Sequence, residues 1–401
     1  MVLPPNVCQR RHWVMFFNKL KNIMLNENQT LRSGIGLNSK PSTYFHQYNL
    51  FDVDEPQPTS QDFPSKYNIL DSLPSLEIFN QLALNDCVAV SGSFALYVAL
   101  YKKAGIQFMP SVKYGFYAGR IVSAGYLDAV AEEKILENQA NNGQSSFRVI
   151  TPSGGLKPTD DISMSFTDYF VAIAKKYNEV GDQQLVPGLY QYGIPSEELV
   201  PSFPDNSFSE DYIKRFRTDH KLQIDFMNQG LPNEVGFQYK KGQYKLVLDE
   251  VMLKLIKLDN SQELVKKLKE LLVQDKTIMF GMSVDDSQFW KKDSALWKEG
   301  LFSLDNGIAQ QQNYGHAMVI VGFDDEKVID SDHPDRKGAF IVRNSWGVAF
   351  GDHGYWYLPY QLVYTFPQPP FFNSFGVGFV YIDDLSINAS SLEAHIAKME
   401  K

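Results

Sequence analysis

The chain has 401 residues, of which 44% are hydrophobic and 21% charged, and its formal net charge is −9. This length corresponds to one large or two to three ordinary domains, and the composition is typical of a folded chain with a sizeable core. The acidic balance argues against a nucleic-acid surface, and no apolar run approaches the roughly 18 residues that a membrane span needs.

Residues 1–60 are polar and rich in Asn and Gln, and we interpret them as a partly disordered leader and linker. They lack the long apolar stretch and small-residue cleavage site of a secretory signal. The chain has two cysteines, Cys8 and Cys87, which are too few for a disulfide framework. We therefore expect a soluble protein of a reducing compartment, either cytoplasmic or exported without a cleaved signal, and leave its location open.

The first strong pattern after the leader is a helix that starts at Cys87 and stops at Gly105. Asp86 is a suitable N-cap, because its carboxylate can accept from backbone N–H groups of the first turn. The run between these residues is apolar almost all round, so we expect the helix to be buried between other layers.

The remainder of the chain changes character near residue 276. Residues 120–275 mix helical stretches with loops, whereas later segments are rich in Val, Ile, Phe and Tyr and are separated by turn residues. A helical first half and a β-rich second half indicate an α+β protein with two segregated layers. The expected strands fall within 277–284, 317–323, 337–346, 354–360 and 374–382, and the expected helices include 165–177 and 259–274.

Three residues have the chemistry of cysteine proteolysis. Cys87 lies at a helix start, where the helix dipole and a nearby imidazolium both favour a thiolate. His316 begins an apolar strand, and Asn344 ends another strand 28 residues later, so adjacent strands can bring the two together. Each residue alone is more often structural: a buried Cys, a core His and a turn Asn. Their joint occurrence in this order favours a nucleophile, a base and a group that orients the base.

The segments around these residues are distinctive. They read FPSKYNIL, FNQLALNDCVAV, FMPSVKYGFYAGR and LYQYGIPSEELVPS in the first half, and YGHAMVIVGFDD, VRNSWGVAFGDHGYWYLP and SFGVGFVYI in the second. On these motifs the chain resembles the papain family of cysteine peptidases, and most closely its microbial and viral branch without disulfides. The resemblance implies a papain-like two-layer α+β fold with the active-site cleft between the layers. It also implies a peptidase domain over 61–385, and the sequence of the remaining residues 386–401 indicates a short C-terminal tail or exposed helix.

The resemblance also implies roles for individual residues. Cys87 would be the nucleophile, His316 the general base and acid, and Asn344 the partner that orients His316. Gln81 precedes Cys87 by six residues and would donate to the oxyanion beside the backbone N–H of Cys87. The expected reaction is peptide-bond hydrolysis through a thioester, on polypeptide substrates, by a monomer without metal or cofactor.

Two further residues are candidates for the substrate-binding region. Trp346 would shield the His316–Asn344 hydrogen bond from water. Gly181 is the candidate for backbone that pairs with an extended substrate, and the competing pair Gly154 and Gly155 can equally form a turn.

The sequence departs from the family pattern next to the nucleophile. Asn85 and Asp86 replace the usual Gly-Ser, Val88 replaces an aromatic residue, and Phe350 replaces the second Trp of the Asn motif. A carboxylate beside the thiol disfavours the thiolate unless it is engaged as a helix cap. Two alternatives therefore stay open: an acyl transferase or deamidase with the same groups, and a catalytically weak or inactive peptide-binding protein.

Overall fold

The computed structural model describes residues 8–9, 52–54, 63–82, 84, 86–116, 118, 193–204, 208–227, 245–256, 261–284, 287–304, 314–330, 333–364 and 378–399. The chain divides into two compact units, each built from segments that are distant in sequence. The first comprises Met1–Leu25, Phe51–Gln107 and Leu253–Asp383, and the second comprises Asn26–Leu50, Phe108–Met252 and Asp384–Lys401. The expected domain limits at 61 and 385 stay a prediction.

The first unit is built on a mostly antiparallel sheet, which has nine strands among the described residues. Its central strand is β8 (Tyr314–Val328), which pairs with β7 (Ile278–Ser283) on one side and β9 (Lys337–Arg343) on the other. The strand order continues from β9 to β10 (Tyr355–Pro359), and from β7 to β11 (Gly378–Ile387), β6 (Leu248–Ile256) and β2 (Asp52–Asp54). The short strands β1 (Cys8–Gln9) and β3 (Lys66–Asn68) also pair with β8.

Helix α2 (Cys87–Ala104) confirms the expected bounds. It ends at Gly105, which adopts a left-handed conformation with φ of 69° and donates its N–H to the Tyr101 carbonyl. Asp86 is the N-cap residue, but its carboxylate makes no capping hydrogen bond, so that part of the prediction was wrong. The backbone of Asp86 has φ −112° and ψ 19° rather than the extended conformation from which a cap side chain reaches the first turn.

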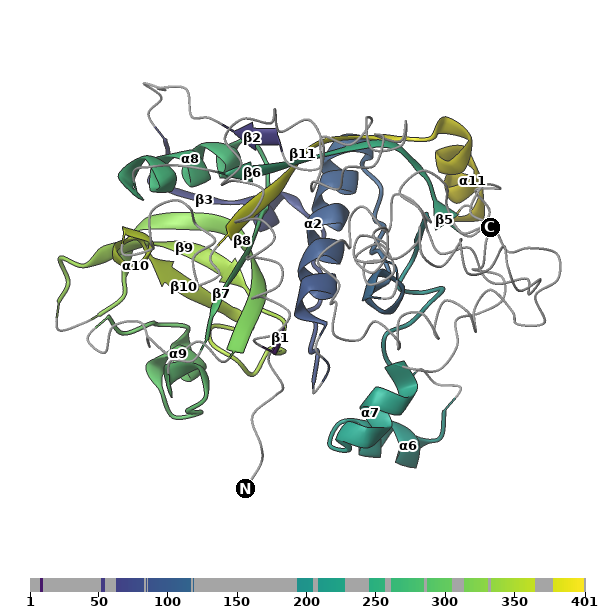
Figure 1. Cartoon of the computed structure of the whole chain (residues 1–401), viewed down its shortest axis with the longest axis horizontal. Helices are drawn as coiled ribbons and strands as arrows, with labels where there is room; N and C mark the ends of the chain where they lie inside the picture. The colour runs from purple at the N-terminus through teal and green to yellow at the C-terminus, as the bar shows by residue number, and fades with distance from the viewer. Residues whose placement is uncertain are drawn as a thin grey trace, which may run out of the picture. The chain divides into compact units, whose positions relative to one another are not determined.

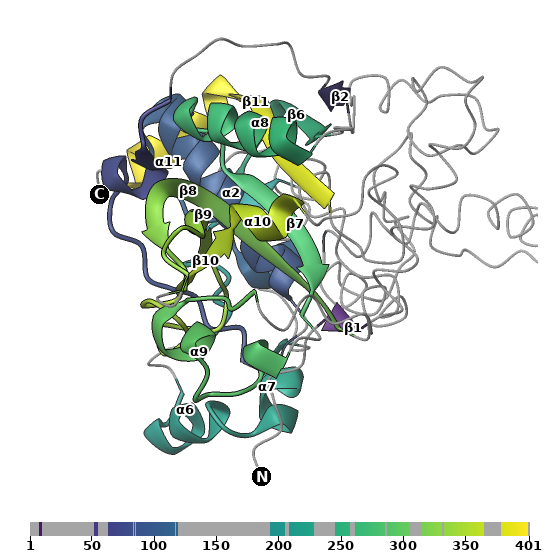
Figure 2. The same cartoon turned by 90° about the vertical axis from the view of Figure 1, so that its left-hand side faces the viewer.

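Helices lie on both sides of the sheet in the first unit. Figures 1 and 2 show α2 on one side of strands β7–β10 and α10 (Tyr360–Tyr364) on the other. Helix α8 (Ser261–Val273) contacts β3, β7 and β8. The short helices η5 (Ser287–Phe289) and α9 (Ala295–Glu299) follow β7 along the chain. Apolar residues of α2, such as Leu96 and Leu100, are fully buried, as the run of apolar residues predicted.

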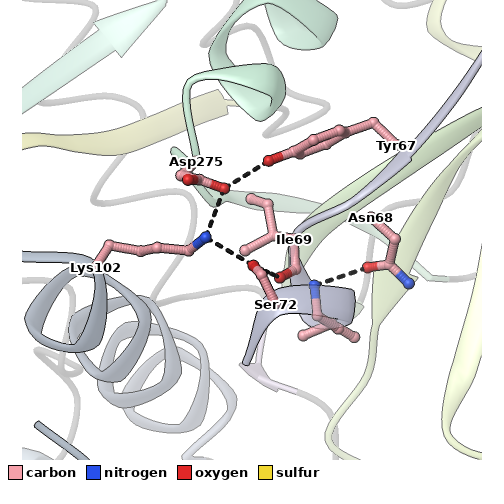
Figure 3. Close-up of polar contacts among 7 residues, drawn as sticks. Tyr67, Asn68, Ile69, Ser72, Lys102 and Asp275 are labelled. Carbon is pink, nitrogen blue, oxygen red and sulfur yellow. Dashed lines mark hydrogen bonds and ion pairs between the residues drawn. The ribbon is translucent and has the colours of Figure 1, made fainter. Parts of the chain in front are cut away.

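The C-terminal end of α2 is held by a polar network (Figure 3). Lys102 Nζ lies 2.8 Å from Asp275 Oδ1 and donates to Ser72 Oγ at 2.7 Å. Tyr67 donates its hydroxyl to the same Asp275 oxygen at 2.6 Å. Ser72 ends the short helix η2 (Ile69–Ser72), whose N-cap Asn68 accepts from the Leu70 N–H. These contacts join α2 to β3, η2 and the turn that precedes β7, which fixes the far end of the helix that begins at Cys87.

The second unit has fewer described elements. They are β4 (Ile194–Pro195), β5 (Lys245–Leu246), α6 (Glu210–Phe216), α7 (His220–Met227) and α11 (Ala389–Met399). The segment expected to be a short exposed helix or tail forms the helix α11, whose Ser391 is buried and accepts from the Val247 N–H at 2.8 Å. All five expected strands and the helix near 259–274 are confirmed, so the protein is of the α+β class. The helix expected at 165–177 lies outside the described residues. None of the described helices has the length and apolar character to cross a membrane.

Candidate active site

The start of α2 lies against the central strand of the first unit. Cys87 is the first residue of α2 and is fully buried, and it packs against Ala317. Ala317 follows His316 in β8. The candidate nucleophile therefore sits beside the strand segment that carries the candidate base, although the two residues are far apart in sequence.

His316 and Asn344 form a buried hydrogen bond. His316 Nε2 lies 2.7 Å from Asn344 Oδ1, which also accepts from the Ser345 N–H at 2.8 Å. Because this oxygen is an acceptor, His316 Nε2 must carry the proton that it donates. In the neutral imidazole the other nitrogen, Nδ1, then has a lone pair, and it makes no hydrogen bond to the residues that the structure describes. The arrangement leaves one buried nitrogen able to take a proton.

The protonation of His316 follows from its surroundings. Burial lowers the pKa of His316 to about 4, and the hydrogen bond to Asn344 opposes this shift. An imidazole that must give up hydration to become charged stays neutral at ordinary pH. His316 is therefore a base in this state of the protein and not an imidazolium.

An aromatic wall covers the His316–Asn344 pair. The Trp346 ring stacks on the His316 ring with centroids 4.7 Å apart and an interplanar angle of 23°. Trp346 is 6% exposed and is itself enclosed by further aromatic rings. These rings belong to Phe289, Trp290, Trp297 and Phe350. Trp346 thus covers one face of the imidazole, and its role in shielding the His316–Asn344 hydrogen bond from water stays a prediction.

Gln81 is held against Ser345, just after the C-terminal end of β9. Its backbone N–H donates to the Ser345 carbonyl at 2.8 Å, and its side-chain oxygen accepts from the Ser345 hydroxyl at 2.6 Å. Gln81 Nε2 donates to the Leu84 carbonyl at 2.6 Å, which uses one of its two protons. The side chain is fully buried. Ser345 was not singled out from the sequence, although its place in the NSW motif is the signal that could have found it.

The Cys87 sulfur is not a free thiol in this structure. Cys87 is disulfide-bonded, and the described residues include no free cysteine. Our sequence analysis did not anticipate this bond, because two cysteines separated by a long polar leader give no pairing signal. A disulfide sulfur has no nucleophilic thiolate, so the site is chemically blocked until the bond is reduced.

Two points concern the glycine candidates and metal binding. Gly181, Gly154 and Gly155 lie outside the described residues, so their part in substrate binding stays a prediction. Among the described residues, no three His, Cys, Asp or Glu side chains gather as a metal site would require.

Comparison with known proteins relates part of this chain to one family. Residues 220–362 match the family model described as "Papain family cysteine protease". Over 99 residues the chain is 32% identical to an uncharacterized peptidase C1-like protein of Acanthamoeba polyphaga mimivirus, covering 25% of this chain and 27% of that protein. Over 133 residues it is 28% identical to cathepsin S of Bos taurus, covering 32% of this chain and 35% of that protein. The matches thus span roughly a quarter to a third of the length of these relatives.

Solved structures of cysteine proteases are also similar. Xylellain from Xylella fastidiosa has 15% sequence identity and a TM-score of 0.44, over 87% of this chain and 99% of that chain. The bromelain protease from Ananas comosus has 13% identity and a TM-score of 0.40, over 80% and 99%. At these values the fold class rests on the elements described above and not on the two likenesses.

Proposed function

We propose that this chain, whose residues 220–362 match the papain family model, is a cysteine-type endopeptidase. The observation that carries the proposal is the His316–Asn344 hydrogen bond, which leaves His316 Nδ1 as a buried base. The matched segment contains His316 and Asn344 but neither Cys87 nor Gln81. Support for those two comes from the motif around them and from their contacts with Ala317 and Ser345.

The first chemical step needs Cys87 as a thiol, so reduction of its disulfide precedes catalysis. His316 Nδ1 then accepts the thiol proton, and the thiolate sulfur attacks the carbonyl carbon of the peptide bond. The helix N-terminus at Cys87 stabilises the thiolate, because its backbone N–H groups and dipole favour negative charge there. Asn344 holds the imidazole in the tautomer that this transfer requires.

Attack turns the carbonyl oxygen into an oxyanion, which needs hydrogen-bond donors. The donors in our proposal are the backbone N–H of Cys87 and the second proton of Gln81 Nε2. Gln81 is well held for this role because Ser345 and Leu84 fix both ends of its amide. A donor fixed in advance needs no reorganisation during the reaction.

The intermediate collapses when His316, now an imidazolium, gives its proton to the leaving amine nitrogen. The C–N bond breaks and a thioester to Cys87 remains. His316 then takes a proton from water, whose oxygen attacks the thioester carbon, and the acid is released as the thiol is restored. An acyl transferase or deamidase would share the thioester and differ in the group that resolves it or in the amide that is attacked.

The test is cleavage of denatured casein and a fluorogenic peptide by protein reduced with dithiothreitol. Cys87→Ala and His316→Ala should each lower turnover by at least about a thousandfold, and the double variant should be no worse, because the groups act as one unit. His333→Ala is the matched control, since this partly exposed histidine pairs with Asp330 in a loop outside the site. Turnover near that of the wild type in His316→Ala would overturn the assignment of the base.

Product analysis separates the remaining alternatives. Mass spectrometry of the products shows whether water or an added amine resolves the thioester, which distinguishes a peptidase from an acyl transferase. Reduced wild-type protein that binds the peptide and leaves it intact would instead identify a peptide-binding protein, and the proposal would be wrong.

A further inference from the structure

The residue directly before Asn344 is a buried arginine. Arg343 ends β9 and is 8% exposed, so its guanidinium lies inside the first unit. Burying this charge is expensive unless its N–H groups find acceptors. The sequence analysis assigned Arg343 no role.

The guanidinium contacts two aromatic rings and two hydrogen-bond acceptors. Its central carbon lies 4.5 Å from the centroid of the Phe94 ring and 5.8 Å from that of Tyr355. Nη1 donates to the Tyr355 hydroxyl at 2.8 Å, and Nη2 donates to the Glu77 carbonyl oxygen. The planar group is thus held by ring faces and by acceptors that meet its N–H groups in fixed directions, which a lysine cannot reproduce.

These contacts reach the segments that carry Cys87, Gln81 and Asn344. Phe94 lies on α2, seven residues or about two turns after Cys87, and so on the same face of the helix. Glu77 is four residues before Gln81. Tyr355 pairs with Arg343 in the β9–β10 register, and Asn344 follows at once in the chain.

We propose that Arg343 is a positioning residue that sets the start of α2 and the Gln81 segment relative to Asn344. It does not touch the reacting atoms, and it acts through Phe94 and Glu77. The inference rests on the proposed peptidase function, since it gives Cys87, Gln81 and Asn344 their roles. Replacing buried charged groups by well-packed apolar side chains is often neutral or stabilising, and this tendency favours a geometric role for Arg343.

The experiment compares Arg343→Met, Arg343→Lys and Phe94→Leu in the reduced full-length chain. Lys337→Met is the control, because Lys337 begins the same strand and its ion pair with Glu326 is exposed. We measure kcat and KM with a peptide, and the pH dependence of Cys87 alkylation by iodoacetamide. Alkylation needs no peptide substrate, so it reports on the thiol and its base even if the protein cleaves nothing.

Arg343→Met should lower kcat by about tenfold to a hundredfold with KM within about twofold, as expected when reacting groups are displaced by about 1 Å. Its alkylation profile should shift to higher pH, because a displaced base stabilises the thiolate less. Arg343→Lys should recover only part of both effects. Phe94→Leu keeps the hydrogen bonds of Arg343 and tests the ring contact alone, so it serves if Arg343→Met does not fold.

Two results distinguish a failure of the Arg343 inference from a failure of the proposed function. If folded Arg343→Met and Phe94→Leu keep the wild-type kcat and alkylation profile, or only the melting temperature falls, Arg343 is structural and the inference is wrong. If reduced wild-type protein cleaves no peptide, the proposed function fails, and the alkylation profiles still decide whether Arg343 positions the thiol.

Discussion

Each unit contains a titratable side chain that is removed from water, partly for Glu197 and fully for His316, and the two differ in their hydrogen bonds. In the second unit the Glu197 carboxylate accepts from the Val112 N–H at 2.9 Å and from the Ser202 N–H and hydroxyl at 2.6 and 3.0 Å. In the first unit His316 Nδ1 has no hydrogen bond to the described residues. A saturated buried group holds structure in place, whereas an unsaturated one keeps a lone pair available for chemistry.

The same physical cause moves both groups toward their neutral forms. Burial raises the pKa of Glu197 to about 7, against the opposing effect of the hydrogen bonds that it accepts and of the nearby Lys113 charge. Burial also lowers the pKa of His316 to about 4. Glu197 and His316 therefore differ in their hydrogen bonds, whereas burial favours the neutral form of both.

Reduction of the Cys87 disulfide should have the largest effect on activity, because it places a thiol beside His316. Reduction of the Cys87 disulfide by a dithiol yields a thiol beside β8, and activity should rise from none to full turnover. The pKa of His316 should rise above about 4, because a thiolate nearby favours the imidazolium. Peptide cleavage with and without dithiothreitol, and NMR titration of the histidines, measure the two changes. Full activity without reductant would contradict the blocked state.

The partner of that disulfide can be tested separately. Cys8 is the other cysteine in the chain, and β1 pairs with β8 at Gly315 and Tyr314, directly before His316. A Cys8→Ser variant should therefore be active and labelled by iodoacetamide at Cys87 without reductant, while the wild type is not. Peptide mapping by mass spectrometry reads the label. A variant that still needs reductant would show that Cys87 is blocked in another way, such as a mixed disulfide formed by exchange with an external disulfide.

A smaller loss of activity is expected when Gln81 is replaced. Its amide makes two hydrogen bonds within the protein and, in our proposal, a third to the oxyanion. Gln81→Ala should lower kcat by roughly 10²–10³ with little change in KM, as loss of one oxyanion donor does. It should also lower stability by about 1–3 kcal/mol, because the buried Ser345 hydroxyl and Leu84 carbonyl lose their partner.

Gln81→Glu keeps the contact with Ser345 and loses the donor to the Leu84 carbonyl. A carboxylate still accepts from Ser345 but repels the developing oxyanion, so kcat should fall at least as far as in the alanine variant. Steady-state kinetics and thermal melting check both variants, and an unchanged kcat in Gln81→Ala would remove the oxyanion role.

The smallest effect is on the pH dependence of stability. The folded-state pKa of Glu197 is raised from 4.5 to about 7, so its contribution to stability falls as pH rises between these values. The folded-state pKa of His316 is lowered from 6.5 to about 4, so its contribution falls as pH drops through that range. Glu197→Gln should abolish the first trend and leave the second. Urea denaturation between pH 4 and 7 tests this, and an unchanged profile in the variant would contradict it.

Local sequence signals predicted α2 and the strands well. The start of α2 at Cys87 and its stop at Gly105 follow from residues next to one another, and the β8 and β9 runs follow from β-branched and aromatic composition. The Asp86 cap failed because capping depends on one backbone conformation, which the residue type does not determine.

The contacts of the site were less accessible to sequence reasoning. The bonds of Gln81 to Ser345, and of Arg343 to Glu77, join residues more than 260 positions apart and depend on how the two segments pack. The disulfide of Cys87 depends on chain geometry in the same way. The motifs therefore predicted which residues carry the chemistry, and the structure showed the residues that contact them.

The stacking of Trp346 on His316 gives the site an optical signal of its own. A protonated imidazole quenches the fluorescence of an indole in contact with it, and these rings lie 4.7 Å apart. The difference in emission between the wild type and Trp346→Phe should therefore follow the titration of His316. In the disulfide-bonded protein this transition should fall near pH 4, and reduction should move it upward. Trp346 fluorescence should therefore follow the reduction of the Cys87 disulfide in real time, without added label or substrate.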